Sequence, residues 1–309
     1  MANYILSCTS TADLSKEKFE KRDIRYIRFH FNLNGVDHED DLGETMPFHE
    51  FYNRMANGEM TKTSQPAIGD YEAYFRELLK ENKNILHVCL SSGLSGDLNA
   101  ATLAASHLMD EDKDVRIIVL DSLAASSGYG LLMDAAADQR DAGLSMDELA
   151  MWINDNKLRV HHWFFSTDLK YYVRGGRVSA ASGFVGNLLH ICPLLNVSNE
   201  GRLVPRAKVH GVKKVEKEIV ERMKQWADNG LDYADKCFIS HSDCMGFVQP
   251  IVDMIEEAFP NLKGKIEIYS IGTTIGLQIY RKSSSAHGNP RSKQLRGQTS
   301  NEKHPQHHQ

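Results

Sequence analysis

Residues 88–101 read Val-Cys-Leu-Ser-Ser-Gly-Leu-Ser-Gly-Asp-Leu-Asn-Ala-Ala, and this segment decides the fold. An apolar run ends at Leu90, two glycines interrupt a serine-rich loop, and an alanine-rich helical pattern follows. Strand, glycine loop and helix in this order are typical of an α/β protein, in which ligands bind beyond the carboxyl ends of the strands. Ser95 falls at or near the helix start, where its hydroxyl and the N–H of Gly96 favour an anion. A second interpretation is that Ser95 only caps the helix.

The same alternation of strand and helix continues on both sides of this segment. It predicts an α/β fold with a largely parallel sheet flanked by helices. Ser145 and Glu148 form a capping box before one of the helices. The strand-like runs are 4–8, 24–31, 85–90, 115–120, 162–166, 194–197, 237–240 and 266–271. The helical patterns cover 48–55, 70–79, 99–108, 124–140, 146–156, 212–226 and 247–258.

The chain divides into two predicted domains and a tail. We expect an N-terminal α/β domain over residues 1–160 and a smaller α/β domain over 161–282. Residues 283–309 are almost free of apolar side chains, so a disordered polar tail is expected. The acidic run at residues 38–41 is expected to be a solvated loop.

Composition excludes several classes of protein. The 309 residues include 36 basic and 41 acidic side chains, a net charge of −5, which disfavours a broad nucleic-acid surface. No run of 18 apolar residues could span a membrane, and residues 1–20 lack the apolar core of a signal peptide. Five irregularly spaced cysteines suit reduced thiols. A cytoplasmic protein is therefore expected.

Two further polar segments could serve a ligand or a partner. The hydroxyl-rich segment 61–66 is predicted to be a loop that donates hydrogen bonds to the same anion as Ser95, or simply a turn. Lys170, Arg174 and Arg177 lie within eight residues, and more basic residues follow. They indicate a docking surface for an acidic partner or phosphoryl group, or a solvated face. The later basic residues are Arg202, Arg206, Lys208, Lys213 and Lys214.

Most enzyme templates do not match. Gly93 to Asp97 resembles a G-x-S-x-G nucleophile elbow but lacks its last glycine. No phosphate-binding P-loop, dinucleotide fingerprint, C-x-x-C or H-E-x-x-H motif is present, so neither a metal nor a cofactor is expected. A serine hydrolase in which His241 activates Ser95 stays as the alternative function.

Four ordered motifs resemble those of the DegV family over roughly residues 1–278. They are Thr63–Ser–Gln–Pro66, Ser91–Ser–Gly–Leu–Ser–Gly96, Asp168–Leu–Lys–Tyr171 with Arg174–Gly–Gly–Arg177, and Ile271–Gly–Thr–Thr–Ile–Gly276. The resemblance implies a two-domain α/β protein that holds one long-chain fatty acid in an internal tunnel. It also implies a non-catalytic subunit of a bacterial fatty acid kinase system. Such a subunit presents the carboxylate to a separate kinase that uses ATP, and the acyl phosphate feeds phospholipid synthesis.

By position in the motifs, Thr63 and Ser95 match the family's carboxylate-binding hydroxyls, and the N–H of Gly96 at the helix start is the third candidate for this site. Arg174, Arg177 and Arg206 match basic residues that could receive the kinase. Apolar stripes suggest a tunnel lining, although such stripes are more often ordinary core. The candidate lining residues are Phe164, Phe165, Phe184, Leu188, Leu189 and Ile275.

The resemblance stops after Leu277. The family continues with a histidine, a glycine turn and a closing strand, whereas this chain becomes polar from Gln278 onward. We therefore expect the last strand to be absent and a sheet edge to be left uncovered, which would weaken binding or stability.

Overall fold

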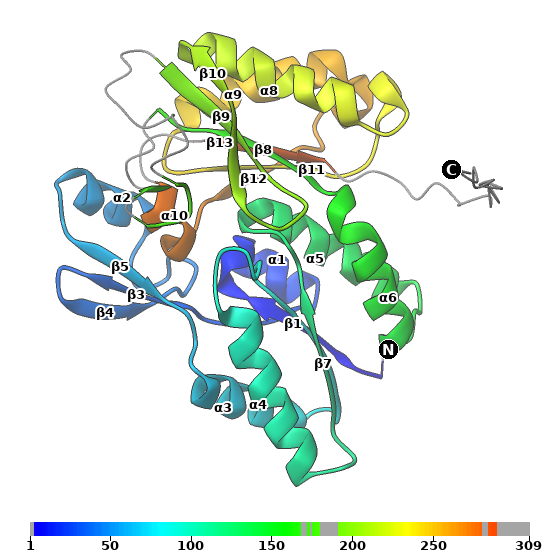
Figure 1. The fold of residues 1–309 in the computed structure, drawn as a ribbon. Helices are drawn as coiled ribbons and strands as arrows, with labels where there is room; N and C mark the ends of the chain where they lie inside the picture. Colours follow the sequence, from blue (N-terminus) through cyan, green and yellow to red (C-terminus); the bar gives the residue numbers. More distant parts are fainter. Residues whose placement is uncertain (1–2, 168–171, 174, 180–190, 280–283, 289–309) are drawn as a thin grey trace, which may run out of the picture.

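The computed structural model describes residues 3–167, 172–173, 175–179, 191–279 and 284–288 (Figure 1). Its first part contains a four-stranded sheet in the order β2-β1-β6-β7, in which all neighbours are parallel. The prediction of a parallel sheet flanked by helices is confirmed. The strands are β1 (Ile5–Thr9), β2 (Arg25–Ile27), β6 (Asn84–Cys89) and β7 (Arg116–Asp121).

Helices cover both faces of this sheet. Because side chains alternate along a strand, Leu86 and Val88 face one core while Ile85 and Cys89 face another. The first core is closed by α1 (Lys16–Lys21), α5 (Ser126–Asp141) and α6 (Met146–Asn156). The second is closed by α3 (Ile68–Leu79) and α4 (Asp97–Glu111). The capping box predicted at Ser145 is present, with both of its hydrogen bonds.

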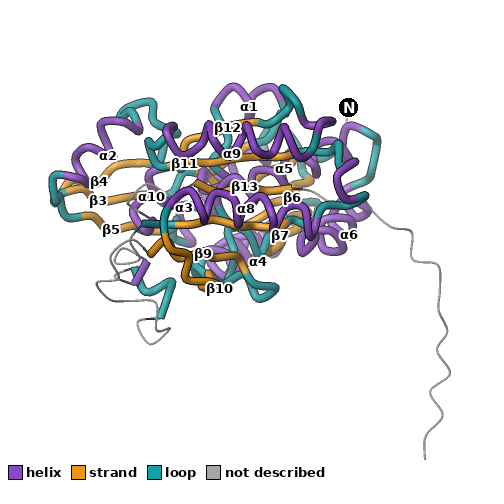
Figure 2. Tube along the Cα trace, turned by 90° about the horizontal axis from the view of Figure 1, so that it is seen from above, coloured by secondary structure: helices purple, strands orange, loops and turns teal. Residues whose placement is uncertain are grey.

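A three-stranded antiparallel sheet in the order β4-β3-β5 stands beside the parallel sheet and packs against α2 (Phe48–Ala56). Its strands are β3 (His30–Leu33), β4 (Val36–Glu39) and β5 (Thr61–Ser64). Figure 2 shows this sheet from above, next to α2 and α10 (Thr273–Ile279). The single strand expected over residues 24–31 is in fact two strands, β2 and β3, which belong to different sheets.

Two segments that were expected to be loops, 61–66 and 38–41, contain strand residues in the structure. The segment 61–66, expected to be a loop, contributes β5, which pairs with β3 through its backbone. The acidic run at 38–41 is solvated only in part, since Glu39 at the end of β4 is exposed, whereas Asp40 and Asp41 are buried. The carboxylate of Asp41 accepts hydrogen bonds from the N–H groups of Glu44 and Thr45, so a turn satisfies it without water.

The second part is built on a six-stranded sheet in the order β10-β9-β8-β13-β11-β12. Its core lies between this sheet and two helices, α8 (Val212–Trp226) and α9 (Met245–Ala258). The strands are β8 (His161–Phe165), β9 (Ile191–Val197), β10 (Leu203–His210), β11 (Cys237–His241), β12 (Glu267–Ser270) and β13 (Ser284–Gly288). Short 3₁₀ turns are η1 (Ser10–Ala12), η2 (Lys157–Arg159), η4 (Gly230–Asp232) and η5 (Pro260–Leu262).

The expectation of a disordered tail from residue 283 is wrong for residues 284–288. These residues form β13, which pairs antiparallel with β8 on one side and β11 on the other. The expected loss of the last strand and the uncovered edge are therefore also wrong. A strand paired on both sides is held by its backbone groups, which do not depend on an apolar sequence. Residues 289–309 lie outside the described residues.

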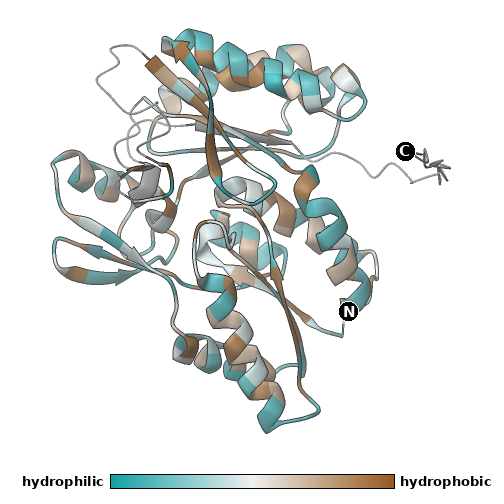
Figure 3. Cartoon of the chain, in the orientation of Figure 1, coloured by the Kyte–Doolittle hydropathy of each residue, from teal (hydrophilic) through white to brown (hydrophobic). Residues whose placement is uncertain are grey.

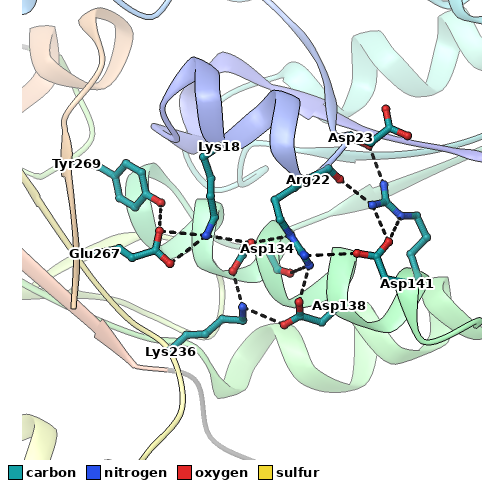
Figure 4. Close-up of polar contacts among 10 residues, drawn as sticks. Lys18, Arg22, Asp23, Asp134, Asp138, Asp141, Lys236, Glu267 and Tyr269 are labelled. Carbon is teal, nitrogen blue, oxygen red and sulfur yellow. Dashed lines mark hydrogen bonds and ion pairs between the residues drawn. The ribbon is translucent and has the colours of Figure 1, made fainter. Parts of the chain in front are cut away.

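A buried ion cluster joins the two parts (Figure 4). Asp134 of α5 has a side chain only 1% exposed and pairs with Lys18 at 3.3 Å, with Arg22 at 2.9 Å and with Lys236. Burial alone would raise the pKa of Asp134. The hydrogen bond from Lys236 and the charges of the three cations outweigh burial and hold the pKa below its ordinary value. Because Lys236 directly precedes β11, the cluster fixes α1 and α5 to the second sheet.

None of the helices in the described ranges has both the length and the apolar character needed to cross a bilayer.

We predict that Asp134→Asn destabilises the protein by about 3 kcal/mol or more, because it removes the buried carboxylate that Lys18, Arg22 and Lys236 share. Because the pKa of Asp134 is lowered in the folded protein, the stabilisation by its carboxylate is fully present above about pH 4, the pKa in the unfolded chain. The stabilisation is lost as pH falls through the lower pKa of the folded protein. Urea unfolding at pH 7 and at lower pH measures both effects, and the loss between the two pH values is expected to be smaller in the variant.

Asp138→Asn is the matched control. Asp138 also pairs with Arg22 and Lys236, but its side chain is 44% exposed, so a loss below about 1 kcal/mol is expected. Equal losses in the two variants would contradict the assigned role of Asp134.

Candidate functional site

The serine-rich loop lies at the carboxyl end of β6, and the hydroxyl of Ser95 links it to the end of β5. Ser95 Oγ donates to Gln65 Oε1 over 2.7 Å and accepts the Asp97 N–H over 3.2 Å. Helix α4 begins at Asp97 with Gly96 as its N-cap, so Ser95 lies one residue before the cap. The loop therefore places a hydroxyl just before the helix start, as the sequence suggested.

Thr63 and Gln65 lie on one face of an extended segment. Thr61, Thr63 and Gln65 are half-buried, whereas Lys62 and Ser64 are exposed. Gln65 precedes Pro66, which favours an extended backbone and continues the alternation beyond β5. By this alternation Thr63 shares a face with Gln65, the residue that contacts Ser95, and lies about 6.6 Å from it along the strand.

Asp97 anchors the start of α4, a role for which the sequence pattern gave no sign. Its buried carboxylate accepts hydrogen bonds from the Tyr71 hydroxyl and from the Leu90 N–H, which ties the first helical residue to the end of β6. Burial raises the pKa of Asp97 to about 6. The carboxylate of Asp97 already lies at the positive end of the α4 dipole. Binding of a further anion would therefore depend chiefly on hydroxyl and N–H donors.

Close backbone contacts require the glycine at position 93 of the loop. A Cβ at Gly93 would lie 2.7 Å from the carbonyl oxygens of Glu200 and Gly201, in the turn between β9 and β10. Ser91 Oγ donates to the same Gly201 oxygen over 2.8 Å. The β9–β10 hairpin therefore closes directly onto the loop.

The three arginines predicted to receive a partner have different surroundings. Arg177 is half-buried, and its Nε donates to the carbonyl of Leu94 over 3.3 Å, so this cation lies beside the serine loop. Burial lowers the pKa of Arg177. Arg206 is exposed on β10 and donates to Asn196 over 2.7 Å. Arg174 lies outside the described residues.

An apolar cluster lies behind the loop. It includes two of the predicted lining residues, Phe164 and Ile275, together with Leu90 and with Leu94, which directly precedes Ser95. Figure 3 shows the apolar colouring of β9, which contributes Leu195 to this cluster. The cluster joins β6, β8, β9 and α10.

Phe165 does not belong to this cluster. It is fully buried in the separate core beneath α8 and α9, because neighbouring residues of β8 point to opposite faces. The structure therefore does not bring Phe164 and Phe165 to one wall. Phe184, Leu188 and Leu189 lie outside the described residues.

Two buried acids lie at the start of α10, and no sequence motif pointed to either. Asp40 Oδ2 accepts from Ser10 Oγ over 3.3 Å and from the Thr274 N–H over 3.4 Å. Asp13 accepts from the Ser126 hydroxyl at the start of α5, and its other carboxylate oxygen lies beside Gly272, which directly precedes α10. Burial raises the pKa of both carboxyls. The Gly–Thr–Thr motif thus positions the helix that carries Ile275.

The hydrolase alternative requires a serine–histidine pair. Ser95 has Gln65 and Asp97 as its hydrogen-bond partners, and the Nδ1 atom of His241 accepts the Cys244 N–H over 3.2 Å. The described contacts therefore do not join Ser95 to His241. Within the described ranges, no group of three or more His, Cys, Asp or Glu residues is arranged to hold a metal ion.

Comparison with known proteins gives consistent similarities. A family model described as "Uncharacterised protein, DegV family" matches residues 8–283. A DegV domain-containing protein of Clostridium perfringens is 33% identical over 276 residues, which cover 89% of this chain and 94% of that protein. Another, from Streptococcus pyogenes, is 34% identical over 222 residues, 72% of this chain and 78% of that protein.

Solved structures share the fold. A DegV lipid-binding protein of Thermotoga maritima superposes with a TM-score of 0.80 at 26% identity, over 93% of this chain and 98% of that one. The Streptococcus pneumoniae fatty acid kinase (Fak) B3 protein, loaded with linoleic acid, gives a TM-score of 0.80 at 21% identity, over 94% and 100%. The second likeness shows the fold alone. From the family model and the curated relatives together, this chain belongs to the DegV family.

Proposed function

We propose that this protein binds one long-chain fatty acid, with its carboxylate at Thr63, Ser95 and the Gly96 N–H. The observation that carries the proposal is the junction at Leu94 and Ser95. Leu94 packs on the apolar cluster, and the next residue offers a hydroxyl. A polar head site and an apolar wall are thus adjacent in the chain. The lipid-binding relative from Thermotoga maritima supports the same ligand class.

The energetics favour a long chain. Each buried methylene contributes about 0.8 kcal/mol, so sixteen carbons supply on the order of 10 kcal/mol before ordering costs. Phe164 and Ile275 are the described candidates for the wall, and Phe184, Leu188 and Leu189 are proposed to extend it. Phe165 is left out because it packs in the other core.

The head site suits a carboxylate that must later react. Two hydroxyls and an N–H neutralise a carboxylate less tightly than a bidentate arginine, so an oxygen stays available as a nucleophile. We infer that a separate kinase docks at Arg174, Arg177 and Arg206. In its step the carboxylate oxygen attacks the γ-phosphorus of ATP, ADP leaves, and an acyl phosphate forms. The DegV chain itself does no catalysis, and the acyl phosphate would supply phospholipid synthesis.

We also propose a domain boundary near residue 160 and a cytoplasmic location. The change of sheet between β7 and β8 supports the boundary. All five cysteines are buried free thiols, which suits a reducing compartment.

The first test is the ligand and its head site. Mass spectrometry of lipid extracted from the native protein is expected to show a long-chain fatty acid at close to one per chain. Replacing Thr63 and Ser95 together with alanine is expected to abolish acyl-phosphate formation by an ATP-dependent fatty acid kinase, because the carboxylate loses its two hydroxyl donors. Unchanged acyl-phosphate formation in that variant would refute the assigned hydroxyls. Turnover of activated esters, with Ser95 labelled by a phosphonate, would support the hydrolase instead.

The second test separates docking from lipid binding. We predict that Arg206→Glu raises the kinase KM for the loaded protein about tenfold or more, because a reversed surface charge opposes an acidic partner. Its fatty acid content is expected to stay unchanged. Lys113→Glu, an exposed reversal just beyond the end of α4 that is remote from the serine loop, serves as the control. It is expected to leave the KM within about twofold. The docking surface is wrong if both reversals have equal effects.

A further inference from the structure

The proton of Ser95 already has a partner. Ser95 Oγ donates to Gln65 Oε1 and accepts the Asp97 N–H, at 2.7 and 3.2 Å. A serine hydroxyl carries one proton and two lone pairs, so one lone pair remains. A carboxylate only accepts hydrogen bonds. It therefore finds no proton to accept from Ser95 in this arrangement.

We propose that Gln65 is a positioning residue that reverses its hydrogen bond with Ser95 when a carboxylate binds. This inference rests on the proposed function. A half-turn of the terminal amide exchanges Oε1 for Nε2, and Nε2–H then donates to the remaining lone pair of Ser95. The serine proton is released to the carboxylate. The hydroxyl then accepts two hydrogen bonds while it donates one, an arrangement in which the bonds strengthen one another.

The surroundings of Gln65 suit this reversal. Pro66 is buried and restricts the backbone of Gln65, so the side chain starts from a fixed position. A Cβ at Gly96 would lie 3.2 Å from Gln65 Oε1 and 3.3 Å from Nε2. The two ends of the amide are thus almost equally far from Gly96, and their exchange changes this packing little. The absence of a side chain at Gly96 leaves the room that the amide occupies.

The first experiment is a double-mutant cycle with palmitate, measured by displacement of a fluorescent fatty-acid analogue. Gln65→Met keeps the length of the side chain but neither accepts nor donates as an amide. It is expected to raise the dissociation constant about tenfold, the effect of one hydrogen bond. In a Ser95→Ala background, the same change is expected to alter the constant less than about twofold. Ser64→Ala, exposed and on the other side of the strand, is the control and is expected to bind like the wild type.

The second experiment uses a nearly isosteric variant, Gln65→Glu. The carboxyl group that it introduces cannot donate when ionised but regains a donor when protonated. The ratio of the variant's dissociation constant to that of the wild type is expected to be large at pH 8 and to fall as pH is lowered toward 4.5, near the ordinary pKa of a glutamate side chain. The ratio cancels the titration of palmitate itself. An ionised glutamate would also repel the bound carboxylate, so the neutral Gln65→Met variant reports the loss of the donor alone. A side chain that does not act at the head site would leave the ratio constant.

The outcomes separate the two proposals. If the wild type binds no palmitate, the proposed function itself is wrong. If the wild type binds but Gln65→Met binds equally well, or weakens the Ser95→Ala variant just as much, only the role of Gln65 is overturned. The role of Gln65 is also overturned if the ratio of the Gln65→Glu dissociation constant to that of the wild type does not change with pH.

Discussion

Position 93 has no room for a side chain, and the arrangement of the candidate site depends on this constraint. A Cβ at this position would lie 2.7 Å from the carbonyl oxygens of Glu200 and Gly201, and Ser91 donates to the Gly201 oxygen. The loop after β6 is thereby fixed to the β9–β10 hairpin at one point. Its other end is fixed to β5 through Ser95 and Gln65. Three segments that are distant in sequence meet in one short loop.

Four buried carboxylates fall into two electrostatic classes. Asp134 is surrounded by three cations, and its pKa is lowered. Asp13, Asp40 and Asp97 are held by hydroxyl and N–H donors, and burial raises their pKa values. The first class makes a charged joint between the two parts. The second class organises the starts of α4 and α10 through neutral hydrogen-bond donors.

Sequence patterns predicted the strongly periodic elements. The helix expected over residues 212–226 is α8 with the same bounds, because its apolar stripe and core face agree. Elements that depend on pairing were missed. β5 is polar and is held by β3, and β13 is held by two neighbours, so neither has an apolar pattern to detect. The strand expected over 24–31 was split because periodicity does not show where a chain changes sheets.

For the site, the motif located Ser95 correctly at the end of a strand and beside a helix start. It gave no sign of Gln65 or Asp97 as partners, because hydrogen bonds between segments depend on the packing of elements that are remote in sequence. Phe165 was misassigned to the wall for a simpler reason. An apolar run such as Trp163 to Phe165 does not show which residues face which side until the strand is placed.

The position of β13 has a consequence for the order in which the molecule assembles. This strand, formed by residues 284–288, is interior to the sheet, between β8 and β11. During synthesis the ribosome releases β8 to β12 before it releases β13. Until then β8 and β11 each have an unpaired edge. The six-stranded sheet is complete only when β13 pairs with both of them.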